Sequence, residues 1–316
     1  MASADSVVVR DSSAATPARS WLQWLIWSDG FWAFLFLLPT FLGLTIVLGS
    51  VIGGLIISLT RWDILTLPEW IGIGNYLAIF REDELFRKSL FNTLYFTVGV
   101  VPLGTIFSLI AAVIMNQNLK GRSLFRTVYF LPTVCSGIAI ALLWAWLYNA
   151  QFGLINAMLR SVGLPKVAWL GDLGWINTHL ALIVPFWLGG AFGTFLLRQF
   201  FLSLPNELGD AAKVDGCNPF QTYWDIYMPL TKPALATLAV LTFMSRWNDL
   251  LGPLIYLNRP EMMTVTAGLS YFQGQYLADV PLLMAGSVIS IIPTLVLFAL
   301  AQRYFVQGVV LSGLKG

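Results

Sequence analysis

The chain has 316 residues, of which 57% are hydrophobic and only 11% are charged, with a formal net charge of +2. A soluble domain is about one quarter charged, so this composition excludes an ordinary water-soluble protein and predicts a chain whose apolar surface faces a bilayer. The small net charge gives no basic surface for nucleic acid, which is therefore not an expected partner, whereas membrane lipid is.

The N-terminal residues precede the membrane-embedded part. Residues 1–20 are rich in Ser, Ala and Asp, a composition typical of disorder. Trp21, Trp24 and Trp27 then recur at every third position, which fits a helix lying in the membrane interface or a simple extension of the first span. The expected divisions are a disordered or interfacial segment, a transmembrane domain and a cytoplasmic tail, at 1–30, 31–310 and 311–316.

Six apolar stretches are long enough to cross a bilayer as helices. They are expected at about 31–59, 90–115, 127–147, 175–197, 234–257 and 280–305. The sequence therefore predicts an all-α, polytopic membrane protein with about six transmembrane helices. Each stretch contains a proline, which breaks one backbone hydrogen bond and bends a helix; membrane helices of any function tolerate this.

The distribution of Lys and Arg predicts the orientation. The clearest segment is 116–126, which holds Lys120, Arg122 and Arg126 and no acidic residue. The long segment 60–89 also holds four cations, but five acidic residues accompany them. We therefore expect both termini and the 116–126 segment in the cytoplasm.

Residues that would support catalysis or metal binding are not found in a recognisable pattern. No GxxxxGK[ST] loop is present, so the chain is not expected to hydrolyse ATP. His179 is the one histidine, and Cys135 and Cys217 have no metal-ligand spacing. We expect His179 to be an interfacial imidazole and both cysteines to be free thiols. No catalytic residue, metal or cofactor is predicted.

The segment 198–232 is long and polar enough to form two short helices outside the apolar stretches. Pro205 and Asn206 are typical of a first helix start, Gly216 of a break, and Asn218-Pro219 of a second start. Aromatic residues of the second helix recur at helical spacing, at Phe220, Tyr223, Trp224 and Tyr227. The segment fits either two amphipathic helices resting on the membrane or a docking module for a cytoplasmic partner.

The spacing within this segment resembles the EAA loop of binding-protein-dependent importer permeases, whose usual form is E-A-A-x3-G-x9-I-x-L-P. The matching residues are Asp210, Ala211, Ala212, Gly216, Ile226, Met228 and Pro229. Every position agrees in spacing, while Asp210 replaces Glu and Met228 replaces Leu. Because Asp is one methylene shorter than Glu, an ion pair to a partner would differ in detail.

The resemblance implies a type I importer permease fold in which 198–232 is the loop that couples transport to an ATPase. The coupling residues would be Asp210, Ala211, Ala212, Gly216, Ile226 and Pro229. It also implies the partners, which are a cytoplasmic ATP-binding-cassette ATPase dimer, a second permease subunit and an extracytoplasmic solute-binding protein. ATP and Mg would be bound by the ATPase and not by this chain.

The resemblance covers nearly the whole chain and points to the carbohydrate branch of these importers. The C-terminal part, with 246–249, 302–308 and 313–316, resembles one permease type of this branch. The earlier part, with 129–132, 143–149 and 153–156, resembles the other type, and the two parts would join near 185–195. The partner permease is therefore expected to be either a different chain or a second copy.

Two groups of polar or aromatic residues are candidates for a substrate path. Arg246 is expected near the middle of the fifth span, where a lone Arg costs about 2.5–3.5 kcal/mol on insertion scales. Asp249 follows three residues later and can pair with it, and Asn248 adds hydrogen-bonding capacity. The group fits either a sugar path or gate, or a neutralised structural pair near the outer end of a shorter span.

The second group lies at the expected outer end of the third span and consists of Trp144, Trp146, Tyr148 and Asn149. Sugars have apolar ring faces and hydroxyl groups, which aromatic rings and amides accommodate. Trp144, Tyr148 and Asn149 are therefore candidate substrate contacts, although an interfacial aromatic belt explains the same pattern. The substrate would be a carbohydrate.

Two other classes of protein remain as alternatives. A secondary transporter driven by an ion gradient would require inverted repeats and membrane-embedded carboxylates. No clear repeat is visible, and Asp249 is the one acidic residue inside an expected span. A noncatalytic membrane scaffold or insertase would not require the 198–232 segment at this spacing. Co-purification of an ATPase would separate the importer from both.

Overall fold

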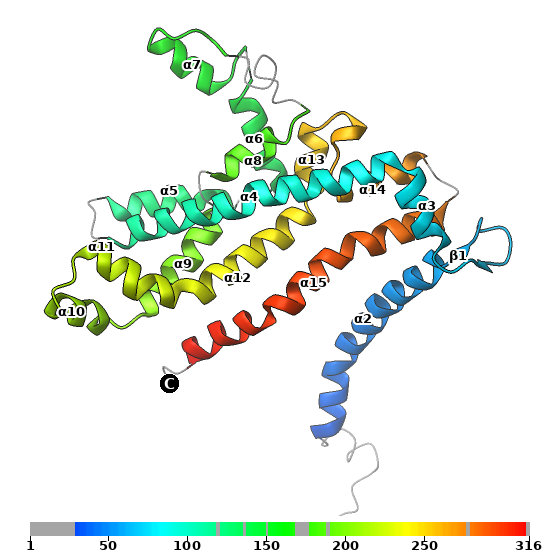
Figure 1. Ribbon diagram of the computed structural model, residues 1–316, viewed down its shortest axis with the longest axis horizontal. Coiled ribbons are helices and arrows are strands. Elements are labelled where there is room, and N and C mark those ends of the chain that lie inside the picture. The colour runs from blue at the N-terminus through cyan, green and yellow to red at the C-terminus, as the bar shows by residue number, and fades with distance from the viewer. Residues whose placement is uncertain are drawn as a thin grey trace, which may run out of the picture. The chain divides into compact units, whose positions relative to one another are not determined.

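The computed structural model describes residues 29–117, 121–134, 137–149, 151–167, 177–187, 190–275 and 279–313. Within these ranges the regular secondary structure is helical apart from one short hairpin, which largely confirms the all-α prediction (Figure 1). Most of the expected N-terminal segment, and the last three residues, lie outside these ranges. The chain divides into two compact units, of which the first ends at Gly53 and the second begins at Gly54.

Five apolar helical stretches among the described residues are long enough to cross a membrane. The first two are α2 (Asp29–Ser58) and α4 (Glu84–Asn116). The third is Leu180–Ser203, which contains α8 (Leu180–Trp187) and α9 (Ala191–Ser203). The fourth is Pro219–Trp247, and the fifth is Val280–Gln302 within α15 (Val280–Gly313). These stretches correspond to five of the six expected spans.

The remaining expected span, 127–147, is divided between two shorter helices. These are α5 (Arg122–Val134) and α6 (Gly137–Leu147), and residues 135–136 between them lie outside the described ranges. Neither helix alone is long enough to cross a bilayer, since about 20 residues are needed. The described part of the chain therefore contains five candidate spanning stretches, and the sixth expected span is interrupted.

The fifth expected span, 234–257, ends earlier than the sequence predicts. Helix α12 (Met228–Trp247) stops at Asn248, and a separate short helix, α13 (Leu251–Tyr256), follows. The Asp249 side chain accepts a hydrogen bond from the Gly252 amide at 3.1 Å, which satisfies a free donor at the start of α13. The prediction that places Arg246 near the middle of a span is therefore wrong, because Arg246 lies in the last turn of α12.

Helix α4 is central to the packing of the second unit. It contacts α8, α9, α12 and α14 (Val265–Gln275), while α12 also packs along α15 (Figure 1). Small hydroxyl residues on the buried side of α4 bond to their own helix, as Thr93 does to Ser89 at 2.7 Å and Thr97 to Thr93 at 2.7 Å. These bonds satisfy polar groups away from water and keep the helix surface small enough for close packing.

The hairpin and α3 (Gly74–Glu82) precede α4. Strands β1 (Thr60–Arg61) and β2 (Glu69–Trp70) pair antiparallel, with Thr60 opposite Trp70. The Asn75 amide donates to the carbonyl oxygens of Ser58 and Thr60, each at 2.8 Å, and so fixes α3 against the hairpin. The segment 60–89, expected as a long charged loop, is therefore an ordered structure.

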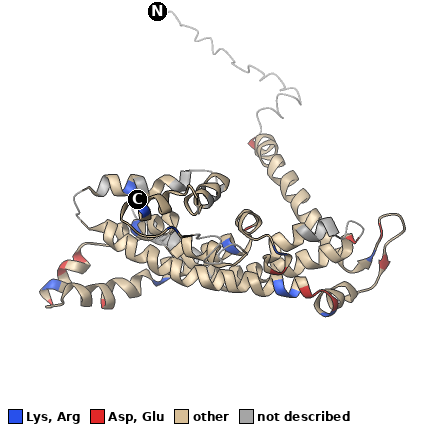
Figure 2. Ribbon diagram, turned by 90° about the horizontal axis from the view of Figure 1, so that it is seen from above, with Lys and Arg blue, Asp and Glu red and all other residues tan. Residues whose placement is uncertain are grey.

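Charged residues of the second unit gather at the two ends of α4. Figure 2 shows Lys, Arg, Asp and Glu around the hairpin and α3, and again around α10 (Glu207–Val214), with long stretches of other residues between them. At about 1.5 Å per residue, the 33 residues of α4 extend about 50 Å, enough to cross a bilayer. The arrangement predicts that the hairpin and α10 face opposite aqueous sides.

Gly193 provides a test of the packing among α4, α9 and α12. A Cβ at Gly193 would lie 2.8 Å from Ser108 Oγ and 2.9 Å from Leu238 Cδ1. We expect Gly193→Val to overpack this contact and to lower the stability of the detergent-solubilised protein by about 1–3 kcal/mol, measured by thermal unfolding. Gly49→Val is the control, because a Cβ there meets no atom within 4 Å. Equal stability of the two variants would contradict the packing.

Candidate functional site

The exposed connection between α9 and the next spanning helix is shorter than the sequence predicts. It consists of residues 204–218, with α10 at its centre. Residues 198–203 belong to α9, and Arg198 is buried there, with its Nε 3.5 Å from the Met115 carbonyl oxygen. Residues 219–232 belong to the following helix. The loop predicted at 198–232 is corrected to 204–218, hereafter the α10 loop.

Helix α10 ends in a glycine-dependent reversal of the chain. The Cys217 amide donates to the Ala212 carbonyl at 2.9 Å, and the Gly216 amide donates to the Lys213 carbonyl at 3.1 Å. This pair of bonds is the Schellman motif, in which the residue after the cap adopts a left-handed conformation. Gly216 has φ of +81°, and a Cβ there would meet no atom within 4 Å. Gly216 is therefore required for its backbone conformation and not for close packing.

The second helix of the segment starts where the sequence predicts, with Asn218 and Pro219. The Asn218 side chain accepts from the Gln221 amide at 2.9 Å, and the Gln221 side chain accepts from the Asn218 amide at 2.9 Å. This reciprocal capping box, with Pro219 in the first helical turn, fixes the start of the helix. The helix then continues through α11 (Pro219–Gln221), the π-helix η1 (Thr222–Tyr227) and α12 without interruption.

The two faces of α10 differ in exposure. Asp210 and Ala211 are exposed, whereas Ala212 is 1% exposed and packs against the protein. Asp210 Oδ1 accepts a hydrogen bond from Lys213 Nζ at 2.9 Å. This hydrogen bond and the nearby negative charge raise the pKa of the Lys213 ammonium. Helix α10 thus presents a small, locally neutralised surface outward while its other face is anchored.

A cavity of about 710 Å³ lies beside α10, between it and the ends of α4 and α9. Tyr223 and Tyr227 line it, whereas Phe220 and Trp224 are exposed and stack on one another with ring centroids 6.3 Å apart. The aromatic stripe predicted for the second helix is therefore divided into two pairs with different surroundings.

Of the remaining residues of the EAA-like motif, Ile226 is half-buried in η1 and Pro229 is exposed in the first turn of α12.

Arg246 and Asp249 form the predicted pair at the C-terminal end of α12. Arg246 Nη1 lies 3.4 Å from Asp249 Oδ2, and the guanidinium carbon lies 3.7 Å from the centroid of the Phe186 ring. The two charged side chains are only 21% and 19% exposed. Asn248 is exposed, and its amide donates to the Met244 carbonyl at 2.8 Å. These contacts fit a structural pair at the end of a shortened span, and they leave a role in the substrate path a prediction.

The aromatic group at the end of α6 is partly engaged in structure. The rings of Trp144 and Tyr148 stack with centroids 5.5 Å apart, and Tyr148 is 7% exposed. Asn149 Oδ1 accepts from the Gln151 and Phe152 amides at 2.9 and 3.1 Å, which forms the turn before α7 (Leu154–Ser161). Trp144 and Phe186 border the same hydrophobic cluster, so the structure brings the two candidate groups to one part of the core.

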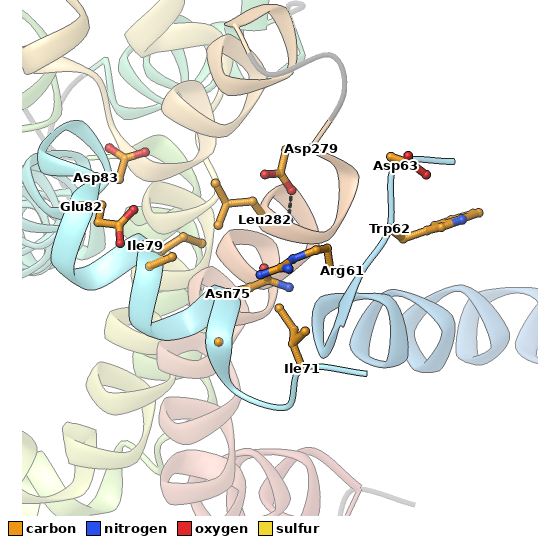
Figure 3. Close-up of a pocket in the computed structure, with 12 residues that line it drawn as sticks. Arg61, Trp62, Asp63, Ile71, Asn75, Ile79, Glu82, Asp83, Asp279 and Leu282 are labelled. Carbon is orange, nitrogen blue, oxygen red and sulfur yellow. Dashed lines mark hydrogen bonds between the residues drawn. The ribbon is translucent and has the colours of Figure 1, made fainter. Parts of the chain in front are cut away.

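A second cavity, of about 620 Å³, lies near the other end of α4 and was not expected from the sequence. Figure 3 shows Arg61 from the hairpin and Asp279 before α15 reaching toward it. Asp279 accepts from the Leu282 amide at 3.1 Å, and Asp83 accepts from the Phe86 amide at 2.8 Å, so two of its acids cap helices. The pKa of Asp63 at its rim is lowered by hydrogen bonds from Thr66.

His179 and Cys217 have roles that the described contacts define. His179 is buried, with Nε2 3.0 Å from the carbonyl oxygen of Met262 in the turn η2 (Pro260–Met262). It is therefore a core residue and not the expected interfacial imidazole. Cys217 is a half-buried free thiol in the α10 loop, and Cys135 lies outside the described residues. Among those residues, no group of three or more His, Cys, Asp or Glu side chains could hold a metal ion.

Residues 104–310 match the family described as "Binding-protein-dependent transport system inner membrane component". The chain belongs to this family. The match includes the α10 loop and both groups of candidate path residues. Membership in a binding-protein-dependent transport family does not favour the alternative of a secondary transporter driven by an ion gradient. Membership in this family, together with the five candidate spans, indicates that the chain is a multi-pass protein of the inner membrane.

Two of the relatives that the chain matches are sugar permeases by name. The chain is 29% identical to the arabinooligosaccharides transport system permease protein AraQ of Halalkalibacterium halodurans over 296 residues, 93% of this chain and 97% of that protein. It is 34% identical to the trehalose/maltose transport system permease protein MalF of Thermococcus litoralis over 201 residues, 63% of this chain and 67% of that protein. The predicted join between two permease types near 185–195 stays a prediction.

Solved structures show the same fold. The chain resembles one in a bacterial alginate ABC transporter in complex with an alginate pentasaccharide-bound periplasmic protein, with a TM-score of 0.71 and 21% identity, covering 86% of this chain and 93% of that one. It also resembles one in a bacterial ABC transporter that imports alginate, with a TM-score of 0.63 and 24% identity, covering 88% and 99%. The type I importer permease fold predicted from the sequence is confirmed.

The Arg246–Asp249 pair can be tested by a double-mutant cycle. Arg246→Ala would leave a largely buried carboxylate without its partner, so we expect it to lower thermal stability in detergent more than the double change to Ala does. The coupling between two such contacting residues is about 0.5–3 kcal/mol. The exposed pair Asp210–Lys213, at the same spacing, is the control and should show coupling near zero. Strict additivity at Arg246–Asp249 would contradict the pairing.

Proposed function

We propose that this family member is the permease subunit of an ATP-driven importer, that it forms a translocation path for a sugar, and that its α10 loop couples this path to a cytoplasmic ATPase. The observation that carries the proposal is the construction of the α10 loop. A short helix is held by a Schellman reversal at one end and leads into a spanning helix through a capping box. Such a loop is stiff enough to transmit force.

The coupling residues act through shape and position. Asp210 and Ala211 lie on the exposed face of α10, which a groove of an ATPase would receive. Ala212 lies on the opposite, buried face and packs the helix against the rest of the protein. Gly216 turns the chain so that the force on α10 enters the helix that begins at Pro219. Ile226 and Pro229 lie within the first three turns of that helix. When two ATPase subunits close on ATP, α10 would move with them and change the packing of α12.

The proposed partners supply the chemistry that this chain does not. ATP and Mg would be bound by a cytoplasmic ATP-binding-cassette ATPase dimer, and the permease itself would have no ATPase site, catalytic residue or cofactor. A second permease subunit, either a different chain or a second copy of this one, would complete the path. An extracytoplasmic solute-binding protein would deliver the substrate on the side of the hairpin.

The substrate class is proposed as a carbohydrate, an oligosaccharide or a related solute. Two named relatives transport arabinooligosaccharides and trehalose or maltose. Trp144 and Tyr148 offer stacked aromatic faces near the core cluster that Phe186 also borders. Arg246, Asn248, Asp249 and Asn149 offer hydrogen-bonding groups, although several of their atoms are already bonded within the chain. The Arg246–Asp249 pair is neutral as a unit, which suits an uncharged sugar.

The proposed orientation places the α10 loop and both termini in the cytoplasm of a bacterial cell. The segment 116–126, with three cations and no acid, adjoins the C-terminal end of α4, and the cavity beside α10 includes residues from that end. The hairpin and α3 lie at the other end of α4 and would face outward. Tail residues 311–316 would then be cytoplasmic.

Two substitutions test the coupling assignment. We expect Gly216→Val to abolish uptake and weaken ATPase retention, because a β-branched residue at φ of +81° costs about 1–3 kcal/mol of strain. Asp210→Lys should do the same, since it would place two cations together with Lys213 at the docking surface. Both chains should remain in the membrane.

The measurements are membrane abundance, ATPase co-purification, and uptake from a panel containing an arabino-oligosaccharide, trehalose and maltose. The matched control is Gly216→Asn, because Asn adopts the left-handed conformation and should retain uptake. Normal uptake in both Gly216→Val and Asp210→Lys would remove the coupling role of the α10 loop.

A further inference from the structure

Helix α10 touches the helix that follows it at one very close point. A Cβ built at Gly209 would lie 2.7 Å from the hydroxyl oxygen of Tyr227 and 3.8 Å from the ring carbon that carries it. The first distance is shorter than van der Waals contact allows, and the second is an ordinary contact. The tyrosine hydroxyl therefore lies directly against the backbone of α10, and glycine is the residue that leaves room for it.

The position of Tyr227 depends on an unusual turn of its own helix. Residues 222–227 form a π-helix, and the Met228 amide donates to the Tyr223 carbonyl, five residues back. Pro229 follows and has no amide hydrogen, so it cannot donate the regular bond to the carbonyl four residues earlier. Thr231 Oγ1 donates to the Tyr227 carbonyl at 2.6 Å and supports the backbone after the turn. A widened turn rotates the side chains before it relative to those after it.

The helix that carries Tyr227 leads directly to the candidate path. It runs on through α12, which packs on α4, α9 and α15. At its far end the Trp247 indole donates to the Ser290 carbonyl of α15 at 2.8 Å, next to the Arg246–Asp249 pair. A displacement at Tyr227 therefore moves α12, the helix whose far end carries Arg246 and Trp247.

We propose that the contact between Gly209 and Tyr227 passes movement of α10 to α12, which rests on the proposed coupling role of the α10 loop. Gly209 and Tyr227 are positioning residues in this account. The competing possibility is that the covalent connection through Gly216 and Asn218 transmits the movement alone. The two possibilities predict opposite effects of Gly209→Ala, because alanine favours a helix more than glycine does and would be harmless if the contact had no role.

The experiment uses the complete complex of permeases, ATPase and binding protein in proteoliposomes, with the panel sugar that the wild-type complex transports. Uptake per inserted chain, hydrolysis of ATP stimulated by the loaded binding protein, and ATPase retention are measured together. We expect Gly209→Ala to retain the ATPase but to lower uptake and stimulated hydrolysis by about tenfold, the scale of one overpacked contact.

Removing the Tyr227 hydroxyl should restore function only in the Gly209→Ala background. Tyr227→Phe alone breaks the contact and should lower uptake and stimulated hydrolysis. Gly209→Ala combined with Tyr227→Phe should recover to within about twofold of wild type, since the new Cβ would lie about 3.8 Å from the ring carbon and so take the place of the hydroxyl. Tyr223→Phe is the matched control, because Tyr223 lies in the same π-helix and lines the same cavity. It should not rescue Gly209→Ala.

The outcomes separate this inference from the proposed function. Wild-type transport by Gly209→Ala or by Tyr227→Phe, or a double variant no better than Gly209→Ala, would overturn the contact as the route of transmission. Equal rescue by Tyr223→Phe would overturn it as well. Normal uptake in Asp210→Lys and Gly216→Val would instead remove the coupling role of the loop. If Asp210→Lys and Gly216→Val lose uptake while Gly209→Ala transports normally, the proposed function stands and only the transmitting role of the contact is removed.

Discussion

Backbone hydrogen bonding away from water is the constraint on which the rest of this structure depends. In a bilayer every backbone amide and carbonyl must be satisfied within the protein, so long helices are favoured and their ends must be capped or brought to water. Three helix ends near the proposed functional residues show how this is done. Helix α10 is closed by a Schellman motif, α11 is opened by a capping box, and α13 is opened by the Asp249 carboxylate. The features proposed to act in transport are thus also the features that complete helix ends.

The same constraint explains how one short loop can be mechanically useful. The α10 loop has no large hydrophobic core of its own, yet the end that leads into the spanning helix is fixed by two successive pairs of hydrogen bonds. Ala212 and Gly209 bring α10 against the protein, and Asp210 and Ala211 remain exposed. A rigid element that is anchored on one face and open on the other can pass force without any reactive group.

Much of the fold could be predicted from the sequence because apolar length alone determines where spans occur. The starts of α2 and α15 and the break at Gly216 followed from apolar runs and from glycine and proline chemistry. The end of α12 could not be predicted in this way. Asn248 and Asp249 terminate the helix through their own side-chain bonds, while the hydropathy of the surrounding residues continues unchanged to Leu257.

The candidate sites were predictable to different degrees. The spacing of the EAA-like residues indicated the α10 loop, because that pattern depends on local turn chemistry. The contact of Gly209 with Tyr227 and the cavity lined by Arg61 and Asp279 depend on residues that meet only through folding, and a single sequence contains no signal for them. The π-helix was missed because the residues of η1 have the same spacing as an ordinary amphipathic helix.

The central claim, that the α10 loop docks on a cytoplasmic ATPase, is tested most directly by site-specific cross-linking. A photo-crosslinking amino acid would replace exposed Ala211 in the membrane-assembled complex, and the same amino acid at Leu65 of the hairpin, which is 92% exposed, would be the control. The account predicts an adduct with the ATPase at residue 211 and none at residue 65, which would also place α10 in the cytoplasm. No adduct at residue 211, or equal adducts at both positions, would contradict it.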